Sequence, residues 1–227
     1  MEGFMYFPSV HVENFFENPY RIINLAKSLS FKKEDNQNYP GVRSRPIDQI
    51  NYELFQYICG KQLSYFYSRQ EMESISYRCE MQFQLIPQGE NAAFVIQTRN
   101  IDYNNLFNTD EEESGTSVVV PTDETGFFLP QQSTNTKDAT DAKIKGINDP
   151  ENTDINKTRE ASDKYNNTFK EVTRFNSIFN SLSMFNSSSF HQAHFNPSGG
   201  ERLTLISFFH DISAPRFPVP EALRIRI

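Results

Sequence analysis

The side chains best suited to chemistry lie in one stretch, FHQAHFNPSGGERLTLISFF, at residues 190–209. This stretch holds two of the four histidines of the chain, His191 and His194, and Arg202 follows His191 by eleven residues. An imidazole can bind a metal ion, and a planar guanidinium can pair with both oxygens of a carboxylate. The stretch therefore raises the question of what a histidine does eleven residues before an arginine, at the start of a run of strand-forming residues.

The composition fits one core rather than two. The chain has 227 residues, of which 37% are hydrophobic and 14% aromatic, and its 21 Phe and 10 Tyr suit a β-rich interior. Its 22 basic and 29 acidic residues give a net charge of -7 without a Lys/Arg-dense tract, which argues against a nucleic-acid partner. No apolar run approaches the roughly 18 residues of a membrane span, and the N-terminus lacks a basic leader. We expect a cytoplasmic protein with two free thiols, Cys59 and Cys79.

Two helices are expected before residue 70. Asn18 can cap a helix that begins at Pro19, and the second helix is predicted over residues 51–67. Between them, YPGVRSRP is predicted to be a turn-rich surface loop, with an anion site at Arg43 and Arg45 as the alternative.

From Tyr77 onward the apolar residues recur with a period of two, which is typical of strands with one buried face. The acidic run NTDEEES is expected to form a solvated hairpin loop, with a cation site as the alternative. Residues 130–170 are polar and lack apolar periodicity, so they are predicted to be an insertion in a single domain spanning 1–227. The expected strands are 77–85, 92–98, 115–121, 184–190 and 202–209.

The order of these elements, helices first and then short strands, favours an α+β chain that is mainly β. Its ordered motifs resemble the prolyl-4-hydroxylase-like proteins of the iron(II)/2-oxoglutarate-dependent dioxygenase superfamily that are common in marine phage and bacterial genomes. The resemblance implies a double-stranded β-helix, or jelly roll, with the N-terminal helices packed outside. It also implies Fe(II) and 2-oxoglutarate as cofactors, His191 as the distal iron ligand and Arg202 as the anchor of the 2-oxoglutarate carboxylate. The motifs are NFFENPYRIINLAKSLSF, YPGVRSRPI, MQFQLIP, SGTSVVVP and ERLTLISFF.

One part of the family pattern is missing. The family places a His-x-Asp or His-x-Glu pair on the strand before the SGTS segment, and the spacing puts that pair at Ile96 and Thr98. His194 is one possible substitute for the histidine, and Glu90 or Asp102 for the carboxylate. His191 and His194 are three residues apart, so they share a face only in a helical or tightly turned segment.

Two functions remain open at this point. The first is a hydroxylase-type oxygenase that acts on a small-molecule or peptidyl substrate. The second is a non-catalytic relative, a pseudoenzyme in which the jelly roll has lost its metal and serves as a binding or scaffolding module. The resemblance favours the first function, and Ile96 and Thr98 favour the second.

Overall fold

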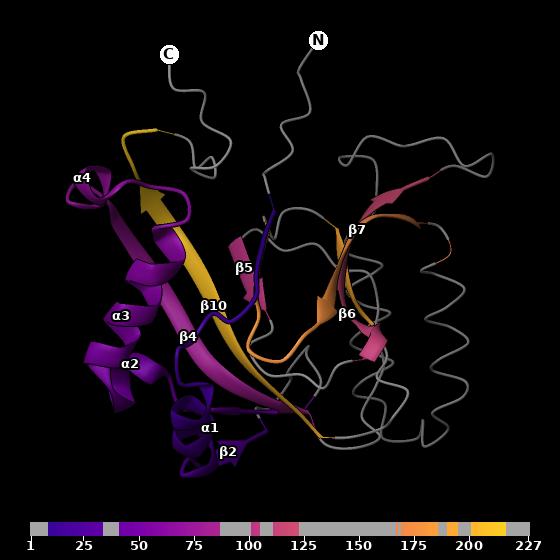
Figure 1. The fold of residues 1–227 in the computed structure, drawn as a ribbon, viewed down its shortest axis with the longest axis horizontal. Coiled ribbons are helices and arrows are strands. Elements are labelled where there is room, and N and C mark those ends of the chain that lie inside the picture. Colours follow the sequence, from indigo (N-terminus) through magenta and orange to yellow (C-terminus); the bar gives the residue numbers. More distant parts are fainter. Residues whose placement is uncertain are drawn as a thin grey trace.

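The computed structural model describes residues 9–33, 41–86, 101–104, 111–122, 167, 169–185, 190–194 and 201–216. These residues form two antiparallel sheets with short helices against one of them (Figure 1). None of the described helices is long and apolar enough to cross a membrane. The mainly β, α+β class is therefore confirmed, while closure of the sheets into a jelly roll stays a prediction.

The helices precede the long strands, as expected. α1 (Pro19–Lys27) begins at the predicted cap, because the Asn18 side chain accepts a hydrogen bond from the Arg21 N–H. α3 (Tyr52–Leu63) is capped in the same way by Asn51 and ends four residues earlier than predicted. Two one-turn helices, α2 (Ile47–Ile50) and α4 (Arg69–Met72), were not expected.

Sheet A has seven strands in the order β1-β8-β5-β10-β4-β3-β2. The long pair β4 and β10 forms its centre and confirms the predicted strands at 77–85 and 202–209. The bounds are β1 (Val10–Val12), β2 (Phe31–Lys32), β3 (Val42–Ser44), β4 (Ser76–Ile86), β5 (Ile101–Asn104), β8 (Leu182–Phe185) and β10 (Arg202–Ser213).

Sheet B has three strands, β7 (Phe169–Ser177), β6 (Glu111–Pro121) and β9 (His191–His194), in that order. β6 contains the predicted strand at 115–121 but begins earlier, so the last acidic residues before it belong to the strand and not to a hairpin loop. Phe169 and Lys170, at the end of the expected insertion, already belong to β7. The rest of that insertion and the expected strand at 92–98 lie outside the described residues.

The structure corrects the prediction of a single strand at 184–190. β8 ends at Phe185 and pairs within sheet A, whereas β9 begins at His191 and pairs within sheet B. The chain therefore changes sheets between these residues, and a single strand cannot pair with both. Phe190 is already beside β6, because its carbonyl accepts a hydrogen bond of 2.8 Å from the Val119 N–H.

The YPGVRSRP segment is a second correction, because Val42–Ser44 is strand β3 and pairs with β4. Gly41 has a φ of 74°, and a Cβ atom there would lie 2.2 Å from the Leu85 carbonyl oxygen. Only glycine allows so close an approach between the two backbones. The glycine of this motif therefore brings β3 onto the edge of β4.

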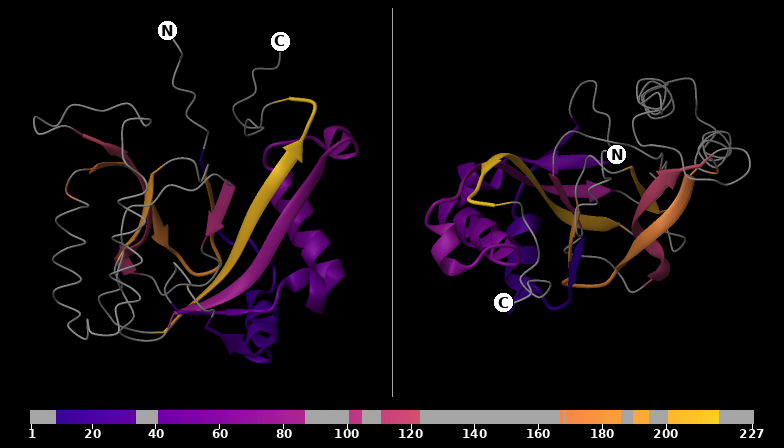
Figure 2. Two further views of the ribbon diagram at one scale, coloured as in Figure 1. Left: turned by 180° about the vertical axis from the view of Figure 1, so that it is seen from behind. Right: turned by 90° about the horizontal axis from the view of Figure 1, so that it is seen from above.

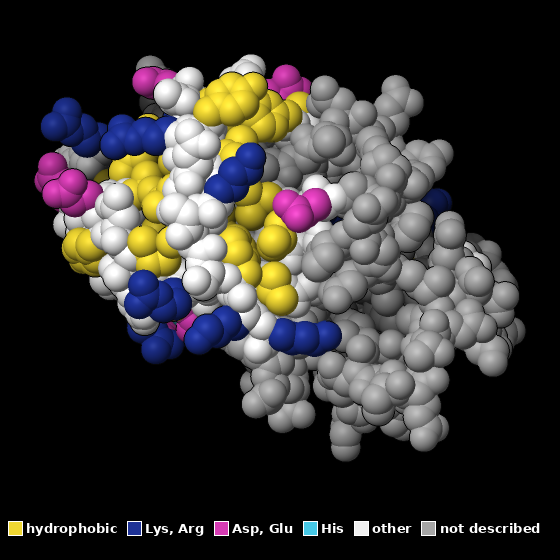
Figure 3. Space-filling model, turned by 90° about the horizontal axis from the view of Figure 1, so that it is seen from below, with side chains coloured by type: hydrophobic (Ala, Val, Ile, Leu, Met, Phe, Trp, Pro, Cys, Tyr) yellow, Lys and Arg dark blue, Asp and Glu magenta, His cyan; other side chains and the backbone are white. Residues whose placement is uncertain are grey.

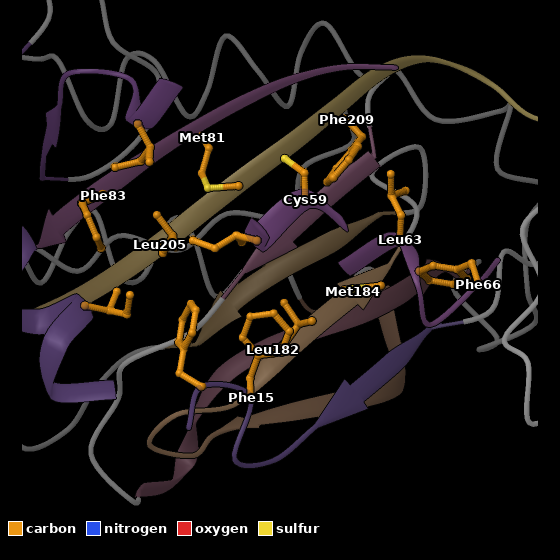
Figure 4. Packing of buried hydrophobic residues seen from close by; sticks show 14 of the residues in the cluster. Phe15, Cys59, Leu63, Phe66, Met81, Phe83, Leu182, Met184, Leu205 and Phe209 are labelled. Carbon is orange, nitrogen blue, oxygen red and sulfur yellow. The ribbon is translucent and has the colours of Figure 1, made fainter. Parts of the chain in front are cut away.

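The main core lies between sheet A and the helices (Figures 1 and 4). Odd-numbered residues of β4 and β10 enter this core, and the Gln62 amide of α3 donates a hydrogen bond of 3.2 Å to the Ser207 hydroxyl. We call this side of β4 and β10 the helix face. Its central residues are Met81, Phe83, Leu205 and Phe209, with Cys59 and Leu63 from α3.

Candidate functional site

The even-numbered residues of β4 and β10 form the opposite side of the sheet, which we call the inner face. Phe208 of β10 is opposite Asp102 of β5, and Asp102 is opposite Phe185 of β8, so these positions share one side of sheet A. The Phe185 ring contacts Phe175 and His191, which belong to sheet B. The inner face is therefore turned toward sheet B, and Figure 2 shows the two sheets on either side of this space.

The inner face is polar at the end where β10 begins. Thr204 is directly opposite Gln84, and Gln84 is opposite Arg43 of β3. Thr204 and Gln84 are only 4% and 6% exposed, although both carry polar side chains. This end of the inner face therefore combines polar side chains with low exposure to solvent.

Arg202 lies at the first position of β10 and belongs to the same inner face, opposite Ile86. Its Nε atom is buried, and burial lowers the pKa of Arg202 to about 10. The guanidinium is still protonated at neutral pH. A positive charge held in the interior stabilises an anion there, and the planar fork of arginine suits a carboxylate.

His191 approaches this space from sheet B. It is 3% exposed, is paired with Val118 of β6, and its ring centre is 5.1 Å from that of Phe185. A row of ring contacts continues from Phe185 to Phe175 at 5.9 Å and from Phe175 to His11 at 6.1 Å. The structure therefore brings His191 and Arg202 to the facing sides of the two sheets.

The described residues around His191 do not make an iron site. Two aromatic rings separate His191 from His11, and His210 lies beside Glu80 at 3.7 Å in the β4–β10 pair. Glu171 is bound to Ser117 and Arg174, which are on the side of sheet B opposite to Val118 and His191. Within the described ranges, no group of three His, Cys, Asp or Glu side chains could hold a metal ion.

The proposed substitutes have different outcomes. His194 ends strand β9, so the helical or tightly turned segment that would put it on the same face as His191 is not formed. Asp102 lies in β5, opposite Phe208 and Phe185. Glu90, Ile96 and Thr98 lie outside the described residues.

Sequence reasoning missed most of the inner face. No role was predicted for Gln84 or Thr204, which the structure shows to be buried. A signal was available in LTLISFF, because both alternating sets contain large apolar residues, which indicates a strand buried on both sides.

Similarity to known proteins is found in the fold and not in the sequence. The sequence has no significant match to a protein-family model or to a curated protein. HygX from Streptomyces hygroscopicus, solved with nickel and 2-oxoglutarate bound, matches with a TM-score of 0.54 and 10% identity, over 90% of this chain and 82% of HygX. HygX with nickel, 2-oxoglutarate and hygromycin B matches over the same shares with a TM-score of 0.51 and 9% identity. At such low identity, this likeness shows a common fold.

A prolyl-4-hydroxylase from Pseudomonas putida also matches, with 13% identity over 89% of this chain and 92% of that protein. Its TM-score of 0.43 is too low to support an argument. The fold that this chain shares is therefore the fold of HygX.

Proposed function

We propose that this protein is a hydroxylase-type member of the iron(II)/2-oxoglutarate-dependent oxygenase family and that its inner face binds 2-oxoglutarate. The observation that carries the proposal is Arg202, a protonated guanidinium with a buried Nε at the polar end of the space between the sheets. The fold shared with HygX, whose structure contains 2-oxoglutarate, supports the same assignment. The substrate is a small molecule or a peptidyl residue.

In this proposal, the distal carboxylate of 2-oxoglutarate pairs with Arg202. The Thr204 hydroxyl lies two residues further along the same face of β10, and the Gln84 amide lies opposite Thr204. A hydroxyl and an amide can each donate a hydrogen bond to a carboxylate. Thr204 and Gln84 are already buried in the protein, and together with Arg202 they orient the ligand.

The test is a titration with 2-oxoglutarate that follows the melting temperature. A ligand at a hundredfold excess over its dissociation constant stabilises a protein by about 2.7 kcal/mol. We expect this stabilisation in the parent protein, none in Arg202→Ala, and a smaller one in Arg202→Lys, which keeps the charge but loses the fork. Arg78→Ala is the matched control, because Arg78 is on the adjacent strand and its side chain is 76% exposed.

Two results would remove the proposal. One is a parent protein that millimolar 2-oxoglutarate does not stabilise. The other is an Arg202→Ala variant that responds like the parent, because the anchor would then lie elsewhere.

The second candidate function is a binding or scaffolding module without iron chemistry. Its support is the sequence, where Ile96 and Thr98 fall at the positions expected for the family's His-x-Asp pair. When bound in this family, iron activates dioxygen, and two imidazoles supply much of its affinity. His191 alone fits that ion poorly.

Anaerobic iron(II) titration of the parent protein beside an Ile96→His, Thr98→Asp double variant separates the two candidates. If only the double variant is stabilised by micromolar iron and, once dioxygen is admitted, converts 2-oxoglutarate to succinate and carbon dioxide, the natural protein is the binding module. If the parent protein does both, it is an oxygenase whose second ligand pair lies at other residues.

A further inference from the structure

A cationic cleft lies at the edge of sheet A, away from Arg202. It has a volume of about 650 Å³ and is formed by the end of α1, the strands β2 and β3, and residues near α2. Its charged lining residues are Lys32, Lys33, Arg43 and Arg45, and none of its lining residues is acidic. In Figure 3, which views the molecule from below, Lys and Arg side chains gather along one edge of the face.

The positive charges of this cleft lie close enough to repel one another. Lys32 of β2 is directly opposite Arg43 of β3 in the antiparallel pair, and like charges in that position repel each other. Arg43 is partly buried, and its guanidinium carbon lies 5.7 Å from the centre of the Phe208 ring, so it remains at the back of the cleft. An anion between the two strands would relieve this repulsion.

The other three cations are available to a ligand. Lys32, Lys33 and Arg45 are exposed, and in the part of the chain that the structure describes none of them is in an ion pair. The chain as a whole carries a net charge of -7, so the cleft is a local exception to a negative protein. A local exception of this kind attracts an anion to one place rather than to the whole surface.

We propose that this cleft, formed around the β2–β3 pair, binds a small ligand with at least two anionic groups, either phosphates or carboxylates. The volume lies within the range of small-molecule sites, about 300–1,000 Å³. Arginine can pair with two oxygens of one anionic group, while the lysines act as point charges on a second. Arg202 does not line this cleft, although Arg43 lines the cleft and is also opposite Gln84 of the inner face, and anion binding in the cleft does not require 2-oxoglutarate to bind.

The experiment is isothermal titration of the full chain with tripolyphosphate and, in a second arm, with citrate. We expect tripolyphosphate to bind and the Lys32→Gln, Lys33→Gln double variant to bind it about tenfold more weakly or worse. The matched control is Arg21→Gln, Arg69→Gln, which removes two exposed charges that do not line the cleft. This control and Arg202→Ala should both retain the parent affinity.

Each outcome has a defined meaning. Tighter binding of tripolyphosphate than of citrate identifies phosphate as the ligand group, and the reverse order identifies carboxylate. Equal weakening by the two double variants would overturn the proposal, because binding would then follow the net charge of the protein. Absence of binding by both probes at about 0.05 M salt, where exposed charges are weakly screened, would overturn it as well.

Discussion

Around Thr204 and Leu205, both faces of the β4–β10 pair bury side chains, yet the two faces are built from different side chains. On the helix face, Leu205 and Phe209 pack with α3 in an apolar core. On the inner face, Thr204 and Gln84 are buried beside the protonated Arg202. The helix face supplies stability through apolar burial, whereas the inner face buries polar groups at the end where β10 begins.

The neighbouring residues Thr204 and Leu205 offer the sharpest test of this difference, since they are next to each other on one strand. Leu205 is buried on the helix face opposite Phe83. Truncation of a buried leucine removes apolar contacts and leaves a cavity, so Leu205→Ala should lower the free energy of unfolding by about 2–5 kcal/mol. Urea unfolding measures this loss, and a value under about 1 kcal/mol would show that the helix face is not the main source of stability.

The second prediction concerns the backbone that holds sheet B over the inner face. Gly115 of β6 has a φ of 123°, and a Cβ atom there would lie 2.0 Å from the Phe175 carbonyl oxygen. Gly115→Ala should therefore lower the free energy of unfolding by about 2 kcal/mol or more.

Gly60 is the matched control for Gly115. It lies inside α3, and a Cβ atom there would have no atom within 4 Å. Because alanine favours a helix over glycine, Gly60→Ala should raise the free energy of unfolding by about 0.5–1 kcal/mol. If Gly60→Ala also lowers the free energy of unfolding, backbone strain at Gly115 is not the cause of the loss in Gly115→Ala.

These residues also show how far the sequence predicts the structure. The capping residues Asn18 and Asn51 and the period-two pattern of β4 are local signals, and the structure confirms the elements that they indicate. The break between Phe185 and His191 depends on which strands pair, and pairing over long separations leaves no local pattern. The cleft could not be predicted from local sequence either, because Lys32 and Arg43 become neighbours only through the β2–β3 pair.

The sequence indicated only some residues of the candidate site, because the others come together through strand pairing over long separations. The resemblance to the oxygenase family singled out His191 and Arg202, and the structure places them on the facing sides of the two sheets. Their roles as iron ligand and carboxylate anchor stay predictions. The burial of Gln84 was not predicted, because the period-two pattern of β4 places it among polar and charged residues, and the burial of Thr204 was missed although LTLISFF indicates a strand buried on both sides.

The third prediction concerns the inner face itself. Thr204→Val removes the hydroxyl of a buried side chain, so the free energy of unfolding should fall by about 0.5–1.5 kcal/mol, the net contribution of one hydrogen bond. The same change should weaken 2-oxoglutarate binding, measured by calorimetry, because the ligand loses one donor beside Arg202. A Thr204→Val variant that loses much stability and keeps full affinity would reverse the roles of the two faces.

The smallest effect is expected at His11, at the end of the row of rings that includes His191. His11 is opposite Ser183 on β8, and its Nδ1 lies 3.0 Å from the Ser183 hydroxyl. Burial lowers the pKa of His11 below its ordinary value of 6.5, against the opposing influence of Glu13.

Because the folded state then disfavours the charged imidazole, the unfolded state binds more protons below pH 6.5. The contribution of His11 to stability is therefore present above that pH and is lost as the pH falls through it. Urea unfolding of the parent protein and His11→Asn at about pH 5 and about pH 8 isolates this contribution, since the other histidines are common to both proteins. The parent should lose more stability at the lower pH than the variant does, and Glu13→Gln should enlarge the loss. An equal loss of stability in the parent and in His11→Asn would show that burial does not lower the pKa of His11.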